Sequence, residues 1–218
     1  MADKRSFAVI GLGTFGAAVA RTLSGFGDHV LGIDRDETRL AREGDRLTRA
    51  VIADAREARA MEEAGLGSYD VAVVAMATDI EANLMAVMNA QNLGVPEVWA
   101  KADSDTHAAI LERVGVARVL QPEVTFGELI AQALHNPRLR GSTRLTGDLH
   151  VAQIEAPKRL CGKTLGALKL GPRYDLRCVG IVRGAVFLDA DPGADVCEGD
   201  GLVVVGTRPA MRAFSDRA

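Results

Sequence analysis

Apolar residues recur with two different spacings along the first 136 residues of the chain. Short β-branched runs are separated by longer stretches with a helical spacing, which is typical of a parallel sheet with crossover helices. The run Val71–Met76 is apolar at every position, as expected of a central strand covered on both faces. The pattern predicts six strands, a full doubly wound set: Phe7–Ile10, His29–Ile33, Ala50–Ala53, Val71–Met76, Val98–Lys101 and Arg118–Leu120.

The helical stretches carry start and stop signals. Thr78 and Glu81 have the spacing of a capping box, which predicts a helix that runs to Leu93 and ends at Gly94. Glycines also follow the helices predicted over 56–64 and 104–114. A last helix, over 123–135, gathers apolar residues on one face, and the pattern leaves open whether that face packs within the chain or on a second subunit. These residues are Phe126, Leu129, Ile130, Ala133 and Leu134.

The pattern changes after residue 136. Residues 137–144 are rich in Pro, Gly and Ser without periodicity and are predicted to form a linker. Beyond them the sequence predicts a small α+β domain over 145–218, following an α/β domain over 1–136 that includes the last crossover helix. Its predicted elements are strands at Leu149–Glu155, Leu176–Arg183, Ala185–Leu188 and Leu202–Val205, a short helix at Lys163–Leu170 and a closing helix at Arg208–Phe214.

Composition narrows the class of protein. The 218 residues include 48% hydrophobic and 25% charged residues, which is typical of a globular chain, and the net charge of −3 argues against a nucleic-acid partner. The longest apolar run, Val71–Ala77, is far shorter than the ~20 residues of a membrane-spanning helix. The N-terminus lacks the features of a signal peptide. Cys161, Cys178 and Cys197 show neither a disulfide nor a zinc spacing, so we expect a soluble protein of a reducing compartment.

The first predicted strand runs directly into Gly11-x-Gly13-x-x-Gly16, which opens a helix. In this motif the first glycine permits a tight turn, the second lets the backbone approach a pyrophosphate, and the third lets helix and sheet lie close. Asp34 ends the second strand 21 residues after Gly13, where an acid binds a ribose diol. The combination favours nucleotide binding on a Rossmann-like fold over a packing role for the glycines alone.

Further polar residues stand near the same sheet edge. Asp34 argues against a 2′-phosphate, although Arg35 beside it weakens that exclusion, so NAD(H) or another adenine nucleotide is favoured over NADP. Asp54, after the third strand, is either an adenine-side residue or a solvated acid. Lys101 ends the fifth strand, and His107 could reach a phosphate or be a solvated helix residue.

The sequence shows no catalytic constellation such as Tyr-x-x-x-Lys or H-E-x-x-H. A nucleotide-binding protein without enzymatic activity is therefore predicted. A small NAD-dependent oxidoreductase remains the main alternative, since it would share the first domain. A redox-sensing DNA-binding repressor would need a basic face and an extra helical domain, which the sequence does not offer.

Six segments follow one another along the chain: FAVIGLGTFG, Asp34-Arg35-Asp36, VIADA, the WAKAD segment through His107, RVLQPE ending at Glu123, and DGLVVVG beginning at Asp200. Together they resemble the RCK (regulator of K⁺ conductance) family, with its TrkA-N and TrkA-C domains. The resemblance covers essentially the whole chain. Its single pair of domains is similar to the cytosolic gating subunit of a Ktr-type potassium uptake system.

The resemblance implies roles for individual residues. Thr14 stands where relatives that prefer ATP and ADP often carry an arginine, so ATP/ADP and NAD(H) both stay open. Glu123 aligns with a glutamate associated with Mg²⁺ or another cation. Some relatives bind cyclic di-AMP between C-terminal domains, for which residues 178–182 are the candidate segment. The implied nucleotide-binding set is Gly11, Gly13, Thr14, Phe15 and Gly16 at the phosphates, Asp34, Arg35 and Asp36 at the ribose, Asp54 and Ala55 at the adenine, Lys101, Ala102, Asp103 and His107 on the phosphate side, and Met76 and Ala77 after the fourth strand.

The resemblance also implies partners. It predicts a homodimer that assembles into a ring, expected to be an octamer, beneath an integral membrane potassium-transporting subunit. The chain itself would be cytoplasmic and peripheral to the inner face of the plasma membrane.

Overall fold

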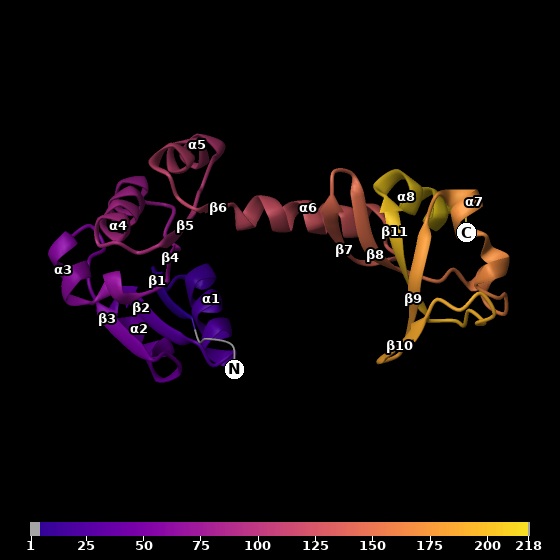
Figure 1. The fold of residues 1–218 in the computed structure, drawn as a ribbon, viewed down its shortest axis with the longest axis horizontal. Helices are drawn as coiled ribbons and strands as arrows, with labels where there is room; N and C mark the ends of the chain where they lie inside the picture. The colour runs from indigo at the N-terminus through magenta and orange to yellow at the C-terminus, as the bar shows by residue number, and fades with distance from the viewer. Residues whose placement is uncertain (1–4, 218) are drawn as a thin grey trace. The chain divides into compact units, whose positions relative to one another are not determined.

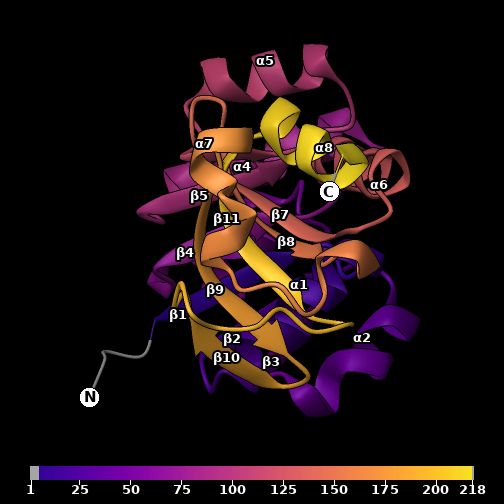
Figure 2. The ribbon, with the colours of Figure 1, turned by 90° about the vertical axis from the view of Figure 1, so that its right-hand side faces the viewer.

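The structure is a computed structural model that describes residues 5–217 (Figures 1 and 2). The chain forms two compact units that divide between Pro122 and Glu123. The sequence instead predicted a division at residue 136, and the difference is the helix α6 (Pro122–His135), which belongs with the second unit.

The first unit contains the parallel sheet that the apolar runs predicted. Its six strands lie in the order β3-β2-β1-β4-β5-β6, so the strand order reverses between β1 and β4. The fourth strand ends at Val74, two residues before the predicted end. The strands are β1 (Ser6–Ile10), β2 (His29–Asp34), β3 (Arg49–Ile52), β4 (Val71–Val74), β5 (Glu97–Lys101) and β6 (Arg118–Leu120).

Helices cover both faces of this sheet. Alternate residues of the central strands pack on opposite sides: Val9 and Val30 lie in a cluster with α1 and α2, whereas Ile10 and Leu31 lie in a cluster with α3, α4 and α5. The Rossmann-like doubly wound fold is therefore confirmed. The helices are α1 (Thr14–Gly25), α2 (Glu37–Glu43), α3 (Ala58–Glu63), α4 (Ile80–Asn92) and α5 (Asp105–Val114), with 3₁₀ turns η1 (Gly44–Arg46) and η2 (Leu66–Ser68).

One predicted helix start is wrong by a residue. Thr78 is not the N-cap of α4, because the side chain of Asp79 accepts a hydrogen bond from the backbone N–H of Ala82 at 3.0 Å. Both residue types are good N-caps, so the sequence could not choose between neighbours. The stop at Gly94 is confirmed by its positive φ of 82°.

The second unit holds a five-stranded antiparallel sheet in the order β10-β9-β11-β8-β7. Its core clusters around Phe214, Leu202 and Ile181, all fully buried. The elements are α6, β7 (Leu139–Thr146), β8 (Leu149–Glu155), η3 (Lys158–Leu160), η4 (Gly166–Leu168), α7 (Leu170–Tyr174), β9 (Arg177–Arg183), β10 (Val186–Asp189), β11 (Gly201–Thr207) and α8 (Arg208–Arg217).

Two predictions in this half are wrong. Residues 137–144 are not a linker without regular structure, because most of them belong to β7, which pairs with β8. The helix predicted over Lys163–Leu170 is a 3₁₀ turn at 166–168, and α7 begins only at Leu170, after Lys169 with its positive φ of 49°. The β9–β10 hairpin and the closing helix α8 are confirmed.

Helix α6 exposes its apolar face. No residue of α6 is buried among those described, and Phe126 and Leu134 are 61% and 77% exposed. Within the second unit, this face therefore does not pack on the antiparallel sheet.

Candidate functional site

A cavity of about 160 Å³ opens at the carboxyl ends of β1, β2 and β3 and the loop after β4. This is the edge where the strand order reverses, the usual ligand site of open α/β sheets. Five of the predicted nucleotide-binding side chains and one glycine meet here. Its lining is Ile10, Gly11, Ile33, Asp34, Arg35, Arg39, Ala53, Asp54, Ala55, Met76, Thr78, Asp79 and Ala82.

The glycine turn has the geometry that its three positions require. Gly11 has a φ of 93°, and a Cβ on Gly16 would lie 1.9 Å from the carbonyl oxygen of Gly11, so each needs glycine. A Cβ on Gly13 would meet nothing within 4 Å. Helix α1 begins with Thr14 and Phe15, and Gly13 is its N-cap. No side chain caps this N-terminus. The turn therefore presents backbone N–H groups to open space, as a phosphate site does.

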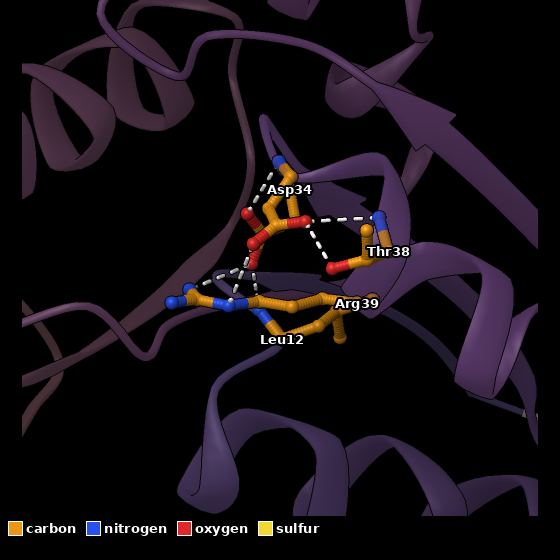
Figure 3. A network of polar contacts seen from close by, with 5 residues as sticks. Leu12, Asp34, Thr38 and Arg39 are labelled. Atoms are coloured by element: carbon orange, nitrogen blue, oxygen red, sulfur yellow. Dashed lines mark hydrogen bonds and ion pairs between the residues drawn. The ribbon is translucent and has the colours of Figure 1, made fainter.

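Asp34 is held in place at the end of β2 by backbone donors (Figure 3). Its side chain is 5% exposed. Oδ2 accepts a hydrogen bond from the N–H of Leu12 at 2.7 Å, and Oδ1 accepts one from the N–H of Asp36 at 2.9 Å. A carboxylate has about four acceptor sites. Asp34 therefore ties the glycine turn to β2 and keeps acceptor capacity for a ribose hydroxyl.

Arg39 lies beside this carboxylate, and sequence reasoning missed it. Its Nη1 is 3.5 Å from Oδ2 of Asp34, and its Nε is 3.4 Å from Oδ2 of Asp36 (Figure 3). The spacing could have shown this, because residues 36 and 39 are neighbours on one helix face. Arg39 and Arg35 both line the cavity and bring positive charge to the ribose side.

Asp36 serves the helix rather than the cavity. It is the N-cap of α2 and accepts hydrogen bonds from the N–H and the hydroxyl of Thr38, at 2.9 and 2.6 Å. These bonds hold the pKa of Asp36 below its usual value. Of the three residues expected at the ribose, Asp34 and Arg35 line the cavity, whereas Asp36 caps α2 and is not part of the lining.

Asp54 lines the cavity with its charge already paired. Nε of Arg56 lies 3.0 and 3.1 Å from the two carboxylate oxygens, and the Arg56 N–H donates to Oδ1 at 3.0 Å. The hydrogen bonds from Arg56 lower the pKa of Asp54 to about 2. Asp54 is therefore ionised at neutral pH and oriented, rather than a freely solvated acid. Ala55 beside it is buried and lines the same cavity.

On the other side of the glycine turn stands Lys101, at the end of β5. Its Nζ lies 5.9 Å from the ring centroid of Phe15, in the first turn of α1. A cation and an uncapped helix N-terminus therefore share the side where phosphates are predicted. Ala77 and Ala102 are buried in the loops after β4 and β5.

His107 is not placed as predicted. Its side chain is 1% exposed, and both ring nitrogens lie within hydrogen-bonding distance of protein groups. A direct contact with a phosphate would need those bonds to break. Asp103 takes part through its backbone N–H, 3.3 Å from Nδ1 of His107.

Glu123 stands exposed in the first turn of α6. Among the described residues, no group of three or more His, Cys, Asp or Glu side chains is arranged to hold a metal ion. Within residues 5–217, Glu123 is therefore not part of such a group.

A larger cavity, of about 600 Å³, lies in the second unit between α6, β7 and α8. It gathers none of the residues that the sequence singled out for binding, and its polar residues include Arg208 and Arg212. We place the candidate site at the strand edge, where the glycine turn and the buried acid meet. No histidine or cysteine belongs to the lining described there.

Two family models match the sequence: the TrkA-N domain over residues 7–122 and the TrkA-C domain over residues 149–218. The chain belongs to the TrkA-N/TrkA-C family. This confirms the resemblance carried by the glycine turn, Asp34 and the later segments.

Relatives of this TrkA-N/TrkA-C protein match it over nearly its full length. Ktr system potassium uptake protein A of Vibrio alginolyticus is 31% identical over 208 residues, 95% of this chain and 94% of that protein. The protein of the same name from Bacillus subtilis (strain 168) is 28% identical over 213 residues, 97% of this chain and 96% of that protein. These relatives favour the potassium-uptake interpretation over the oxidoreductase.

Solved structures show the same fold. The crystal structure of the GsuK RCK domain has a TM-score of 0.65 at 15% identity and covers 99% of this chain and 48% of that chain. The GsuK channel bound to NAD has a TM-score of 0.64 at 15% identity, over 98% of this chain and 39% of that chain. The RCK fold is thus confirmed. No helix among the described residues is long and apolar enough to cross a membrane.

Proposed function

We propose that this chain is the nucleotide-sensing regulatory subunit of a Ktr/Trk-type potassium uptake system. The observation that carries the proposal is the glycine turn tied to Asp34 by the Leu12 N–H, in a chain whose full-length relatives are potassium uptake proteins. A regulator needs a site that binds and releases a ligand, and the strand-edge cavity has binding groups without a catalytic histidine or cysteine in its described lining.

The proposed ligand is an adenine nucleotide: ATP, ADP or NAD(H). The first turn of α1 and Lys101 suit its phosphates, and Asp34 suits a ribose with a free 2′-hydroxyl. Asp34 disfavours a 2′-phosphate by charge repulsion, although Arg35 and Arg39 reduce that effect. One of the solved structures with this fold is a channel bound to NAD.

Sensing requires that the ligand prefers one shape of an assembly. Only a difference in affinity between two shapes can shift their populations. A tenfold preference corresponds to about 1.4 kcal/mol per site, so roughly four sites acting together supply the ~5.5 kcal/mol of a near-complete switch. A ring of subunits with modest sites can therefore control a membrane partner without chemical catalysis.

The proposed assembly is a homodimer that builds a ring, with an octamer as the expected size. It would lie in the cytoplasm against the potassium-transporting subunit at the inner face of the plasma membrane. The exposed apolar face of α6 supports a contact between subunits, because solvent exposure of Phe126, Ile130 and Leu134 is unfavourable for an isolated chain. A cation at Glu123 would then need ligands from a second subunit or from the nucleotide.

Cyclic di-AMP is proposed as a second ligand, at the C-terminal domain. The candidate segment 178–182 lies in β9. Val179 in it and Phe187 on the paired strand β10 are 41% and 57% exposed, which leaves apolar surface for an adenine ring or a partner domain.

A thermal-shift panel tests the nucleotide proposal. The purified chain is heated with ATP, ADP, NAD⁺, NADH or cyclic di-AMP, each with and without Mg²⁺. A ligand at ~100 times its dissociation constant adds about 2.7 kcal/mol to the unfolding free energy, which gives a clear shift in Tm. If none of the adenine nucleotides raises Tm, the proposal is wrong.

The absence of enzymatic activity is tested separately. The chain is incubated with NAD⁺ or NADH and a panel of hydroxy and keto acids, and absorbance at the nicotinamide band is followed. A regulator gives no turnover above the protein-free blank, whereas steady turnover would support the oxidoreductase.

A further inference from the structure

A buried pair of polar side chains links the loops that follow β4 and β5. His107 and Asn83 are 1% and 0% exposed. Nε2 of His107 lies 3.2 Å from Oδ1 of Asn83, and Nδ1 lies 3.3 Å from the backbone nitrogen of Asp103. Nδ2 of Asn83 donates to the backbone carbonyl of Met76 and, at 3.1 Å, to that of Lys101.

The backbone groups fix the role of every atom in this network. The N–H of Asp103 can only donate, so Nδ1 of His107 must be an unprotonated acceptor. The neutral ring then carries its proton on Nε2 and donates it to Oδ1 of Asn83. The carbonyls of Met76 and Lys101 can only accept, which orients the Asn83 amide the same way. One protonation state satisfies all four bonds.

We propose that His107 and Asn83 are positioning residues for the nucleotide crevice, with His107 acting as the neutral Nε2–H tautomer. Met76 lines the crevice, and the ammonium of Lys101 faces Phe15 at the start of α1. The network joins the backbones of both residues, so it sets the separation of the two loops on the phosphate side. His107 thereby acts on the ligand through Met76 and Lys101 and does not touch it. The inference rests on the proposed nucleotide function.

Acid should weaken this link. A second proton on the ring would sit on Nδ1 and face the N–H of Asp103, so an acceptor would become a donor and the bond would be lost. Burial lowers the pKa of His107, and the Asp103 carboxylate opposes that effect. The other groups that face the ring through the network carry no charge there, because Asn83 on α4 is neutral and Lys101 contributes its backbone carbonyl. The neutral ring therefore persists until the pH falls below the ordinary histidine pKa of about 6.5.

Two substitutions separate the halves of the network. His107→Asn keeps an acceptor near the position of Nδ1 and loses the reach to Asn83, whereas His107→Gln keeps the donor to Asn83 and loses the acceptor for Asp103. Dissociation constants for NAD⁺ and ADP are measured by titration calorimetry at pH 7.5, 6.5 and 5.5. His29→Gln is the control, because His29 is exposed at the start of β2.

At pH 7.5 we expect His107→Asn to bind about tenfold more weakly than the unmodified chain, and His107→Gln to stay within about threefold. Between pH 7.5 and 5.5 the unmodified chain and His29→Gln should lose about threefold in affinity relative to His107→Gln at the same pH, because only they can protonate residue 107. The loss stays below tenfold because burial lowers the pKa of His107, so only part of the rings are protonated at pH 5.5. Comparison at equal pH cancels the titration of ADP itself. Equal affinity ratios for all variants at every pH would overturn the proposal.

A measurement without variants covers the case in which they do not fold. Long-range ¹⁵N–¹H NMR of the unmodified chain reports the tautomer and the pKa of His107. If binding needs the neutral ring, saturation with NAD⁺ or ADP must lower that pKa by the base-10 logarithm of the ratio between the dissociation constants of the protonated and the neutral protein. A Nδ1–H tautomer, or a pKa that saturation leaves unchanged, contradicts the proposal. If neither NAD⁺ nor ADP binds at any pH, the proposed nucleotide function is rejected instead. The tautomer of His107 can still be measured in that case, because the NMR experiment needs no ligand.

Discussion

Asp34 has two tasks, and its two oxygens have enough acceptor sites for both. The carboxylate accepts hydrogen bonds from the N–H groups of Leu12 and Asp36 and lies 3.5 Å from Nη1 of Arg39, which leaves one of its about four acceptor sites for a ligand in the cavity that it lines. Such charge-assisted bonds are roughly twice as strong as neutral ones. The buried acid therefore shapes the glycine turn even before a ligand arrives.

Asp34→Asn tests this residue directly. We expect adenine nucleotide affinity to fall about tenfold, because the neutral amide makes weaker bonds to a ribose diol and must turn an N–H toward one of its present donors. Titration calorimetry with ADP and NAD⁺ measures the change. Asp45→Asn is a control of equal charge at an exposed position in η1. Unchanged affinity in Asp34→Asn would remove Asp34 from the site.

A second buried acid stabilises the C-terminal unit. Asp200 is fully buried, and both its oxygens accept hydrogen bonds from Arg183 at 2.8 Å, with a further bond from the Cys197 N–H at 2.7 Å. The Arg183 side-chain bonds hold the pKa of Asp200 below its usual value. The carboxylate thus stabilises the fold above the unfolded pKa of about 3.9, and that contribution is lost as the pH falls through the lowered folded value.

Asp200→Asn should therefore lower the unfolding free energy by about 1–2 kcal/mol at pH 7. The expected loss is no larger because the Arg183 side chain is partly exposed, and solvent weakens its interaction with Asp200. The difference between variant and unmodified chain should shrink between pH 4 and pH 2. Urea unfolding followed by circular dichroism at a series of pH values measures this. A difference that is constant across the series would mean that the ionised carboxylate is not its source.

Among the elements, the glycine turn gives the sharpest contrast between packing and binding. A Cβ on Gly16 would clash with the Gly11 carbonyl at 1.9 Å, whereas one on Gly13 meets nothing within 4 Å, and the φ of Gly13, −66°, suits alanine. Gly16→Ala should lower Tm markedly, because helix and strand must separate.

Gly13→Ala should fold with nearly unchanged Tm and lose about tenfold in nucleotide affinity, because its methyl group occupies the approach of the phosphates. Differential scanning fluorimetry and calorimetry measure the two effects, and normal binding by Gly13→Ala would place the phosphates elsewhere.

The elements also show what the sequence could and could not predict. All six strands of the first unit were predictable, because buried parallel strands are continuous apolar runs such as Val71–Val74. Strand β7 was not, because it lies at the sheet edge with mostly exposed, polar side chains, and its pairing with β8 is a tertiary event.

Within the site, contacts between residues close in the sequence were predictable, whereas contacts between distant residues were not. The glycine turn and Asp34 form a local motif that a sequence can carry. The burial of His107 depends on Asn83, which is 24 residues away on another helix, and no spacing rule joins the two. Arg39 lies between these cases, since its contact with Asp36 follows helix periodicity and its contact with Asp34 does not.

At the scale of the whole molecule, the proposed sensing and the proposed assembly fall on different parts of the chain. The nucleotide crevice is built entirely from residues of the first unit, while the exposed apolar face of α6 belongs to the second. A contact between subunits through α6 would let many weak sites act on one assembly, which the switching free energy requires.

This separation makes a prediction about assembly. The double substitution Leu129→Asp/Ile130→Asp puts two carboxylates on the apolar face of α6, and their burial in a subunit contact would be strongly unfavourable. Light scattering should then show monomers, while ADP and NAD⁺ still bind, because the crevice is unchanged. Glu128→Lys changes the charge by an equal amount of opposite sign, on the side of α6 that lines the second unit's cavity, and should leave assembly intact. If the double variant assembles like the unmodified chain, α6 is not the subunit contact, and the energy of several sites would have to be combined through another surface.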